Sequence, residues 1–137
     1  MDLLFNHVDA VIKGKSVSAI VGLDARGFLF GPSLALHLGV PFIPVRKSGK
    51  LPGEVSGMKF ELEYGSDEFQ IQKDSLKSGD SAIIVDDLLA TGGSLSATCK
   101  LLEGLGVNVV ECLVIMELKE LKGRERLTSP VYSLLQY

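Results

Sequence analysis

Short apolar runs alternate along the chain with stretches of helical periodicity, and this alternation constrains the fold more than any other feature. The apolar runs, which we interpret as buried strands, cover residues 18–22, 41–45, 81–87, 107–116 and 131–137. The helical patterns cover residues 3–13, 31–38 and 94–105. Repeated strand, loop, helix, strand order is typical of an α/β fold in which helices flank a mostly parallel central sheet.

Residues 46–74 depart from this pattern and predict an insertion beside the main sheet. Residues 46–58 hold three glycines, a proline and three cations, which is typical of a mobile surface loop. Residues 59–64 alternate apolar and charged side chains, Gly65-Ser66-Asp67 has turn composition, and the alternation resumes at Phe69. We therefore expect a β-hairpin here.

Nothing in the sequence divides the chain, because it contains no repeat, low-complexity tract or interdomain linker. We expect one domain over residues 1–137, with a short surface helix in the charged residues 117–127. A hydrophobic content of 46% is enough for a core, and the net charge of -3 offers nucleic acid no global positive field. The composition therefore indicates a globular protein that does not bind nucleic acid.

We expect a soluble, cytoplasmic protein without a membrane segment. The N-terminal stretch lacks the basic region of a signal peptide, and prolines and glycines break the uncharged residues 27–45 into shorter elements. Cys99 and Cys112 lie far apart, and no His/Cys cluster has metal-ligand spacing. We expect two reduced core thiols and no zinc site built by the protein.

The stretch AIIVDDLLATGGS, residues 82–94, carries the strongest functional signal. A buried strand ends in Asp86 and Asp87, and a loop of small residues then leads into a helix. Glycines in such a loop let the backbone approach a ligand, and the free N–H groups of the helix N-terminus attract anions. Capping of a turn by the two acids, followed by an ordinary helix start, is the structural alternative.

The common nucleotide motifs do not account for this stretch. Residues 22–27 have the glycine spacing of a Walker A motif, but Phe28 stands where lysine is required, and no GxGxxG occurs. Carboxylates next to a phosphate would repel it, whereas one sugar away they can accept hydrogen bonds from two ribose hydroxyls. A ribose 5-phosphate satisfies both halves of the pattern, with its phosphate in the loop and its hydroxyls on Asp86 and Asp87.

The same stretch resembles the phosphoribosyl pyrophosphate (PRPP) motif of the type I phosphoribosyltransferases. Within that superfamily, four further segments in the same order resemble the adenine phosphoribosyltransferase family: GLDARGFLFGPSLA, RKSGKLPG, LEYGSDEFQIQKD and ELKGRERL with SLLQY. The resemblance implies transfer of 5-phosphoribose from PRPP to adenine, which gives AMP and pyrophosphate in purine salvage. It also implies the type I phosphoribosyltransferase core.

The resemblance assigns a role to each part of the site. The 5-phosphate would be held by Ala90, Thr91, Gly92, Gly93 and Ser94, and the ribose by Asp86 and Asp87. Pyrophosphate would be held by Asp24, Ala25, Arg26, Arg46, Lys47 and Lys50, with a cis peptide near Asp24-Ala25. For the last three cations, a solvated basic stretch is the alternative.

Further implications concern the base, the metal and the assembly. Glu63 matches the family's proton-handling carboxylate, although a strand glutamate facing water would give the same pattern. Leu88 and Leu89 line the purine slot or belong to the core. Mg²⁺ would be carried by substrate oxygens with no direct protein ligand, and a homodimer is implied because some loop cations reach the neighbouring subunit's site.

The chain departs from the family pattern at its N-terminus. Family members carry an N-terminal hood over the base, and this chain begins inside the helix that follows the hood, so we expect the hood to be missing or reduced. Two functions follow from this. The first is an active adenine phosphoribosyltransferase, and the alternative is a PRPP- or AMP-binding truncated homologue with little or no transferase activity alone.

Overall fold

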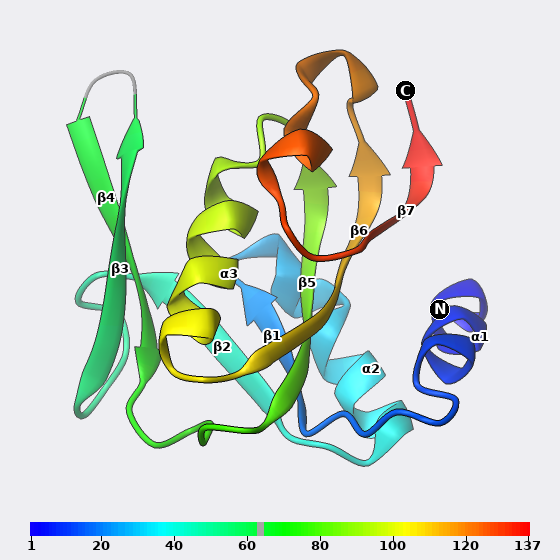
Figure 1. Cartoon of the computed structure of the whole chain (residues 1–137), viewed down its shortest axis with the longest axis horizontal. Helices are drawn as coiled ribbons and strands as arrows, with labels where there is room; N and C mark the ends of the chain where they lie inside the picture. Colours follow the sequence, from blue (N-terminus) through cyan, green and yellow to red (C-terminus); the bar gives the residue numbers. More distant parts are fainter. Residues whose placement is uncertain (63–64) are drawn as a thin grey trace.

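A computed structural model describes residues 1–62 and 65–137 (Figure 1). Within these residues the strands form one seven-stranded sheet in the order β3-β4-β2-β1-β5-β6-β7. Five neighbouring strands, β2-β1-β5-β6-β7, run parallel, which confirms the predicted α/β fold with a mostly parallel sheet. The strands are β1 (Ala19–Leu23), β2 (Phe42–Lys47), β3 (Val55–Leu62), β4 (Gly65–Gln72), β5 (Ser81–Leu89), β6 (Asn108–Glu117) and β7 (Val131–Gln136).

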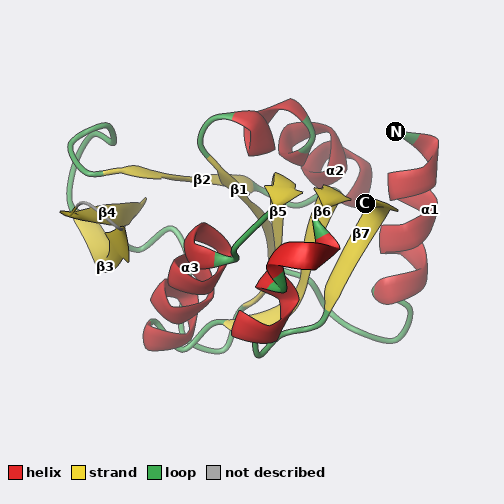
Figure 2. Ribbon diagram, turned by 90° about the horizontal axis from the view of Figure 1, so that it is seen from above, coloured by secondary structure: helices red, strands yellow, loops and turns green. Residues whose placement is uncertain are grey.

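Helices cover both faces of the sheet, as Figure 2 shows. Helices α1 (Asp2–Val11) and α2 (Gly31–Leu38) lie on one face, and α3 (Gly93–Gly104) lies on the other. Each face has its own buried apolar cluster: Leu4, Val8 and Leu34 pack on one side, and Leu95 and Leu102 on the other. The apolar runs are buried on both faces because helices cover both, which is why they read as continuous rather than alternating.

The sheet register places two loops side by side. Strand β1 lies next to β5, with Gly22 opposite Val85, and both strands run in the same direction. Ligand sites in such sheets lie at the carboxyl ends of the strands. The residues that follow β1 and those that end β5 therefore meet at one edge.

Helix α2 follows the prediction closely. It spans Gly31–Leu38, has Pro32 in its first turn and ends at Gly39 with φ 69°. Proline is tolerated in a first turn, where its missing N–H has no intrahelical partner, and glycine adopts positive φ without strain. The sequence therefore placed both ends of this helix.

The insertion is a hairpin, as predicted, but its boundaries differ. Strands β3 and β4 pair antiparallel, with Glu61 opposite Ser66 and Leu62 opposite Gly65. The turn that we expected at residues 65–67 is wrong, because these residues belong to β4. The loop expected over residues 46–58 is also shorter, since β2 extends to Lys47 and pairs with β4, and β3 begins at Val55.

The charged segment is not the surface helix that we expected. It begins in the end of β6 and continues in two short 3-10 turns, η2 (Lys119–Leu121) and η3 (Gly123–Arg126). Lys122 separates the turns at a φ of 52°, a left-handed conformation that interrupts helical hydrogen bonding. As predicted, Cys99 and Cys112 are buried thiols that form no disulfide. No helix in the described part of the chain is long and apolar enough to cross a membrane.

Candidate functional site

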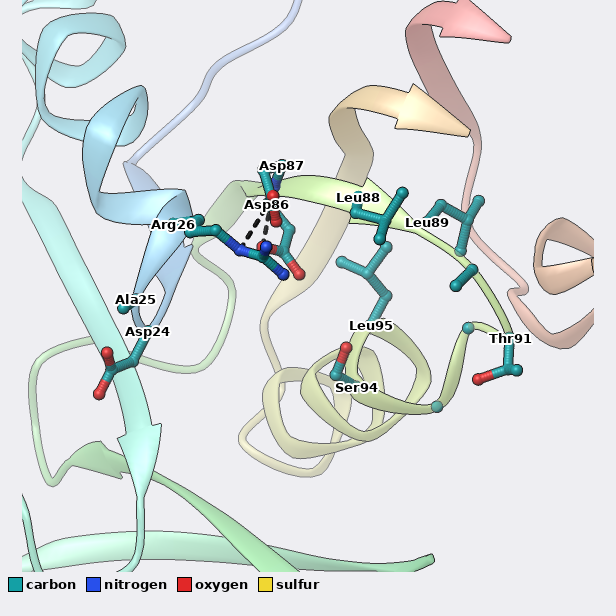
Figure 3. A pocket seen from close by; sticks show the side chains of 13 residues that line it. Asp24, Ala25, Arg26, Asp86, Asp87, Leu88, Leu89, Thr91, Ser94 and Leu95 are labelled. Carbon is teal, nitrogen blue, oxygen red and sulfur yellow. Dashed lines mark hydrogen bonds and ion pairs between the residues drawn. The ribbon is translucent and has the colours of Figure 1, made fainter. Parts of the chain in front are cut away.

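A cavity of about 480 Å³ opens at the edge where β1 and β5 end (Figure 3). Its lining comes from two segments only within the described chain, residues 24–26 after β1 and residues 86–95 at the end of β5 and the start of α3. The structure thus brings together the paired aspartates, the small-residue loop and the segment that contains Arg26. Arg26 is far from the other two groups in sequence, and the aspartates differ in chemistry from the loop beside them. Together the three groups surround one ligand-sized space.

Residues 90–94, called the phosphate loop below, run from the end of β5 into the first residues of α3. Gly92 has φ 86° and lies at the N-terminus of α3, which has no side-chain cap. The first N–H groups of a helix have no intrahelical partner, so they and the positive end of the helix dipole are available to an anion. Thr91 is exposed at the loop and its hydroxyl can add a donor.

The two aspartates differ in their surroundings. Asp87 forms an ion pair with Arg26, whose Nε lies 3.0 Å from Asp87 Oδ2. Asp86 accepts a hydrogen bond of 2.8 Å from the Asp87 backbone N–H. Burial raises the pKa of Asp86 to about 7, and the neighbouring Asp87 carboxylate adds to the increase. Asp86 is therefore poised between its charged and neutral forms near neutral pH.

Asp24 lines the cavity, but its carboxylate is engaged elsewhere. Figure 3 shows it pointing away from the aspartate pair, toward which Arg26 reaches. Arg46 Nε donates to Asp24 Oδ2 over 2.7 Å, and Lys50 Nζ lies 3.9 Å from the same oxygen. The peptide between Asp24 and Ala25 is cis, as the resemblance implied.

The three cations predicted to bind pyrophosphate, Arg46 and Lys47 at the end of β2 and Lys50 just after it, separate into two groups. Arg46 and Lys50 gather on Asp24 beside the cavity, although neither lines it. Lys47 instead lies 3.3 Å from Asp67 of β4, measured from Nζ to Oδ2. The structure therefore brings two of the three predicted loop cations near the site and ties the third to the hairpin.

The residues expected at the base have different placements. Leu88 and Leu89 both line the cavity, but the Leu89 side chain is fully buried in the core whereas Leu88 is only partly covered. Glu63, the predicted proton-handling carboxylate, lies outside the described residues. Leu95, which the sequence did not single out as a site residue, also lines the cavity while it remains buried.

Sequence reasoning missed a contact behind the phosphate loop. Arg126 donates a hydrogen bond of 3.4 Å from a terminal guanidinium nitrogen to the Thr91 carbonyl, and Gly123 packs directly on Ala90 and Gly92. The sequence feature that could have indicated this contact is Gly123, a glycine inside an otherwise charged segment. The pattern of charges alone could not indicate which surface the segment contacts.

Comparison with known proteins agrees with this geometry. The family model described as "Phosphoribosyl transferase domain" matches residues 1–136. Adenine phosphoribosyltransferase of Mus musculus is 54% identical over 136 residues, which are 98% of this chain and 75% of the relative. The chain belongs to the adenine phosphoribosyltransferase family.

Family members from other organisms are also similar to this chain. Adenine phosphoribosyltransferase 1 of Saccharomyces cerevisiae is 53% identical over 129 residues, covering 94% of this chain and 69% of the relative. A crystal structure of the Saccharomyces cerevisiae family member, complexed with an imino-altritol bisphosphate and adenine, superposes with a TM-score of 0.94 at 51% identity, over 98% of this chain and 76% of the other. The crystal structure of a Trypanosoma brucei member in complex with AMP, pyrophosphate and ribose-5-phosphate superposes with a TM-score of 0.86 at 28% identity. The match covers 95% of this chain and 61% of the other.

Proposed function

We propose that this chain transfers the 5-phosphoribosyl group of PRPP to N9 of adenine, which yields AMP and pyrophosphate. The observation that carries this proposal is that an anion-binding loop, two aspartates and Arg26 line one cavity. The family relationship supports the same reaction. The Saccharomyces cerevisiae structure contains adenine, and the Trypanosoma brucei structure contains AMP, pyrophosphate and ribose-5-phosphate.

In this proposal the phosphate loop holds the 5-phosphate with backbone N–H groups and the hydroxyls of Thr91 and Ser94. Asp86 and Asp87 accept hydrogen bonds from the ribose hydroxyls, which lie one sugar away from the phosphate. Only Leu88 and Leu89 separate the aspartates from the loop, so one strand end fixes both the phosphate and the ribose. That arrangement orients the anomeric carbon before any bond changes.

Pyrophosphate lies on the opposite side of the cavity, against Asp24, Ala25 and Arg26. Its departure separates charge, because negative charge accumulates on the leaving group and positive charge on the ribose. Arg26 supplies a permanent cation for the leaving group, and Arg46 and Lys50 stand behind Asp24 as a second positive layer. Lys47 joins them only if its contact with Asp67 opens.

The bond changes balance without a further reactant. The bond between the ribose anomeric carbon and a pyrophosphate oxygen breaks with its electron pair on oxygen, and adenine N9 forms the new bond to that carbon. The N9 proton must leave, and we assign its acceptance to the Glu63 carboxylate on the strength of the family resemblance. Leu88 contributes an apolar wall to the adenine slot, next to the buried Leu89.

Mg²⁺ fits this site as a partner of the substrate. PRPP would supply the phosphate and hydroxyl oxygens that hold Mg²⁺, which are the hard donors that this ion prefers. The Asp86 and Asp87 carboxylates of the cavity would add negative charge near the ion without binding it directly. No group of three or more His, Cys, Asp or Glu side chains forms a metal cage within the described residues. When bound, the metal neutralises charge on the pyrophosphate.

We also propose a cytoplasmic homodimer. Leu3, Leu29 and Leu36 are large apolar side chains that remain 66%, 69% and 84% exposed in the isolated chain, which supports burial against a second copy. The cations at the end of β2 and just after it would then lie near the neighbouring subunit's site.

The test is formation of AMP from labelled adenine, PRPP and Mg²⁺, with Asp87→Asn combined with Thr91→Ala as the inactive control. We expect AMP from the wild type, none above background from the double variant, and little product when guanine replaces adenine. Absence of AMP with retained binding of ribose 5-phosphate would contradict the transferase and leave a PRPP- or AMP-binding protein.

A further inference from the structure

Residues 118–127, called the backing segment below, lie directly behind the phosphate loop. This segment is the part of Figure 1 that follows β6, near the end of β5, and Figure 2 places its 3-10 turns on the same face as α3. The Leu118 N–H donates to the Leu89 carbonyl over 2.9 Å, immediately before the phosphate loop begins. The contact then continues along the loop residue by residue.

Gly123 makes the closest of these contacts. A Cβ on Gly123 would collide with the Ala90 carbonyl oxygen and would lie 3.0 Å from the Gly92 nitrogen. Conversely, a Cβ on Gly92 would lie 2.6 Å from the Gly123 carbonyl oxygen. The two glycines therefore allow two stretches of backbone to touch with no side chain between them. The phosphate loop cannot move toward the backing segment without a steric clash.

Arg126 holds the next peptide of the loop. Its terminal nitrogen lies 3.4 Å from the Thr91 carbonyl oxygen. In a planar trans peptide the C=O and the following N–H point in opposite directions. Holding the Thr91 carbonyl toward Arg126 therefore directs the Gly92 N–H away from the backing segment. Gly92 lines the cavity, so its N–H is one of the donors available to an anion there.

The backing segment is itself anchored from behind. Arg124 donates to both carboxylate oxygens of the buried Glu117, over 3.1 Å and 2.6 Å, and also to the Val131 carbonyl over 2.7 Å. The Ser133 hydroxyl donates to Glu117 over 2.8 Å. This network ties the segment to the ends of β6 and β7. Paired, bidentate contacts of arginine with carboxylate fix orientation as well as distance.

We propose that the backing segment holds the phosphate loop in its phosphate-binding conformation, and that Arg126 is a positioning residue which sets the affinity for the 5-phosphate through the Thr91 carbonyl. This inference rests on the proposed function only for the identity of the ligand. Without Arg126 the Thr91–Gly92 peptide is free to rotate, and the loop must be reordered each time a phosphate binds.

The experiment compares Arg126→Gln with Lys122→Gln. The second variant removes the same charge from the same segment, at an exposed side chain that forms no hydrogen bond or ion pair within the described residues. The readouts are Kd for ribose 5-phosphate and for pyrophosphate by calorimetry, KM for PRPP, kcat and Tm. For Arg126→Gln we expect about a fivefold to tenfold rise in Kd for ribose 5-phosphate and in KM, because a hydrogen bond to a charged group is lost. Pyrophosphate affinity, kcat and Tm should stay near wild-type values.

Two further variants separate positioning from a general structural role. Arg126→Lys retains a cationic donor and should recover most of the ribose 5-phosphate affinity. Gly123→Ala should weaken that affinity more than Arg126→Gln does. If Gly123→Ala fails to fold, the arginine variants decide the question alone.

Equal ribose 5-phosphate affinities for Arg126→Gln and Lys122→Gln would overturn the proposal, as would equal losses for ribose 5-phosphate and pyrophosphate. The outcome is separable from that of the proposed function. A wild type that makes no AMP but binds ribose 5-phosphate, and loses that binding in Arg126→Gln, would contradict the transferase and support the backing role. A wild type that does not bind ribose 5-phosphate would overturn both.

Discussion

Arg26 and Asp87 form an ion pair across the cavity, with Nε 3.0 Å from Oδ2. In the proposed reaction these two groups have different partners, because Arg26 contacts pyrophosphate and Asp87 accepts from a ribose hydroxyl. Substrate binding must therefore exchange the ion pair for two separate contacts. The Arg26 side chain is 67% exposed, so breaking the pair costs about 1 kcal/mol or less. The pair keeps both groups ordered without holding them strongly.

The first prediction concerns the Arg26→Gln variant. Loss of the permanent cation should lower kcat/KM for PRPP by about a hundredfold to a thousandfold, because the charge on departing pyrophosphate is no longer stabilised. The Tm should change by less than about 2 °C, because an exposed ion pair contributes little to stability. Steady-state kinetics and thermal denaturation measure the two effects, and Arg26→Lys should retain more activity. Activity of Arg26→Gln within threefold of wild type would exclude this role.

Much of this site could be predicted because its parts are local in sequence. The two aspartates, the phosphate loop and the start of α3 lie within residues 86–94, so a strand followed by glycines and a helix already indicated an anion site. The meeting of Arg26 with Asp87 follows from the parallel pairing of β1 with β5, in which Gly22 lies opposite Val85. Alternating apolar runs and helices predict parallel strands but not which two are neighbours.

Long-range pairings could not be predicted, because partners on separate elements leave no periodic pattern. Lys47 appeared equivalent to Arg46 and Lys50, yet it contacts Asp67 because β4 pairs with β2 and places Phe69 opposite Lys47. Similarly, charge composition alone predicted a surface helix for residues 117–127. The contact of Gly123 with the phosphate loop depends on how β6 and β7 are joined, which only the folded chain defines.

The second prediction concerns the pH dependence of stability at Asp86. Its pKa is raised from 3.8 to about 7 in the folded protein, so the folded state binds the proton more tightly than the unfolded state does. The stability that protonated Asp86 contributes is therefore lost as the pH rises from 3.8 to about 7. Asp86→Asn should increase the free energy of unfolding relative to wild type, and this gain should grow by about 2 kcal/mol between pH 5 and pH 8.

Urea unfolding at each pH measures the gain for Asp86→Asn. The control is Glu120→Gln, which removes one exposed carboxylate and should give a difference that changes little with pH. A gain from Asp86→Asn that is the same at both pH values would mean that Asp86 is fully charged or fully neutral throughout.

The third prediction concerns Glu117 and Arg124. The Arg124 guanidinium holds the pKa of Glu117 below its usual range, so the stabilising contribution is complete above the unfolded pKa of 4.5 and is lost as pH falls through the lower folded pKa. Glu117→Gln should cost about 2 kcal/mol at neutral pH, because it breaks the two charge-assisted hydrogen bonds that Arg124 donates to the buried carboxylate. The cost should shrink on acidification.

Denaturant titrations near pH 7 and pH 3 test the Glu117–Arg124 pair. Adding Arg124→Gln to Glu117→Gln should recover part of the loss, since the unpaired charge is then absent. Equal losses at the two pH values would indicate that packing rather than charge explains the effect.

The fourth prediction concerns Cys99 and Cys112, whose sulfur atoms lie 3.5 Å apart in the core. The hydrogen bond between them lowers the pKa of Cys99 and raises that of Cys112, while burial shields both. Alkylation of the native protein should be at least about a hundredfold slower than in denaturant, because it requires opening of the core. Cys99 should react first.

Mass spectrometry after timed exposure to iodoacetamide measures the order of labelling. A cysteine introduced at the exposed Ser33 should react rapidly in the native protein and serves as the control. Native labelling of Cys112 ahead of Cys99 would contradict the predicted lowering of the Cys99 pKa and raising of the Cys112 pKa.

The last prediction concerns Gly27, the residue after Arg26. A Cβ at this position would lie 2.6 Å from the Val85 carbonyl oxygen, and backbone at the centre of a sheet cannot move away cheaply. Gly27→Ala should therefore cost about 2 kcal/mol of stability and push Arg26 away from the aspartates, so that kcat/KM for PRPP falls as well. Gly104→Ala is the matched control, because a Cβ there meets nothing within 4 Å and an alanine in α3 should be neutral or slightly stabilising. If Gly27→Ala and Gly104→Ala behave alike, the close approach of Gly27 to Val85 does not hold Arg26 in position.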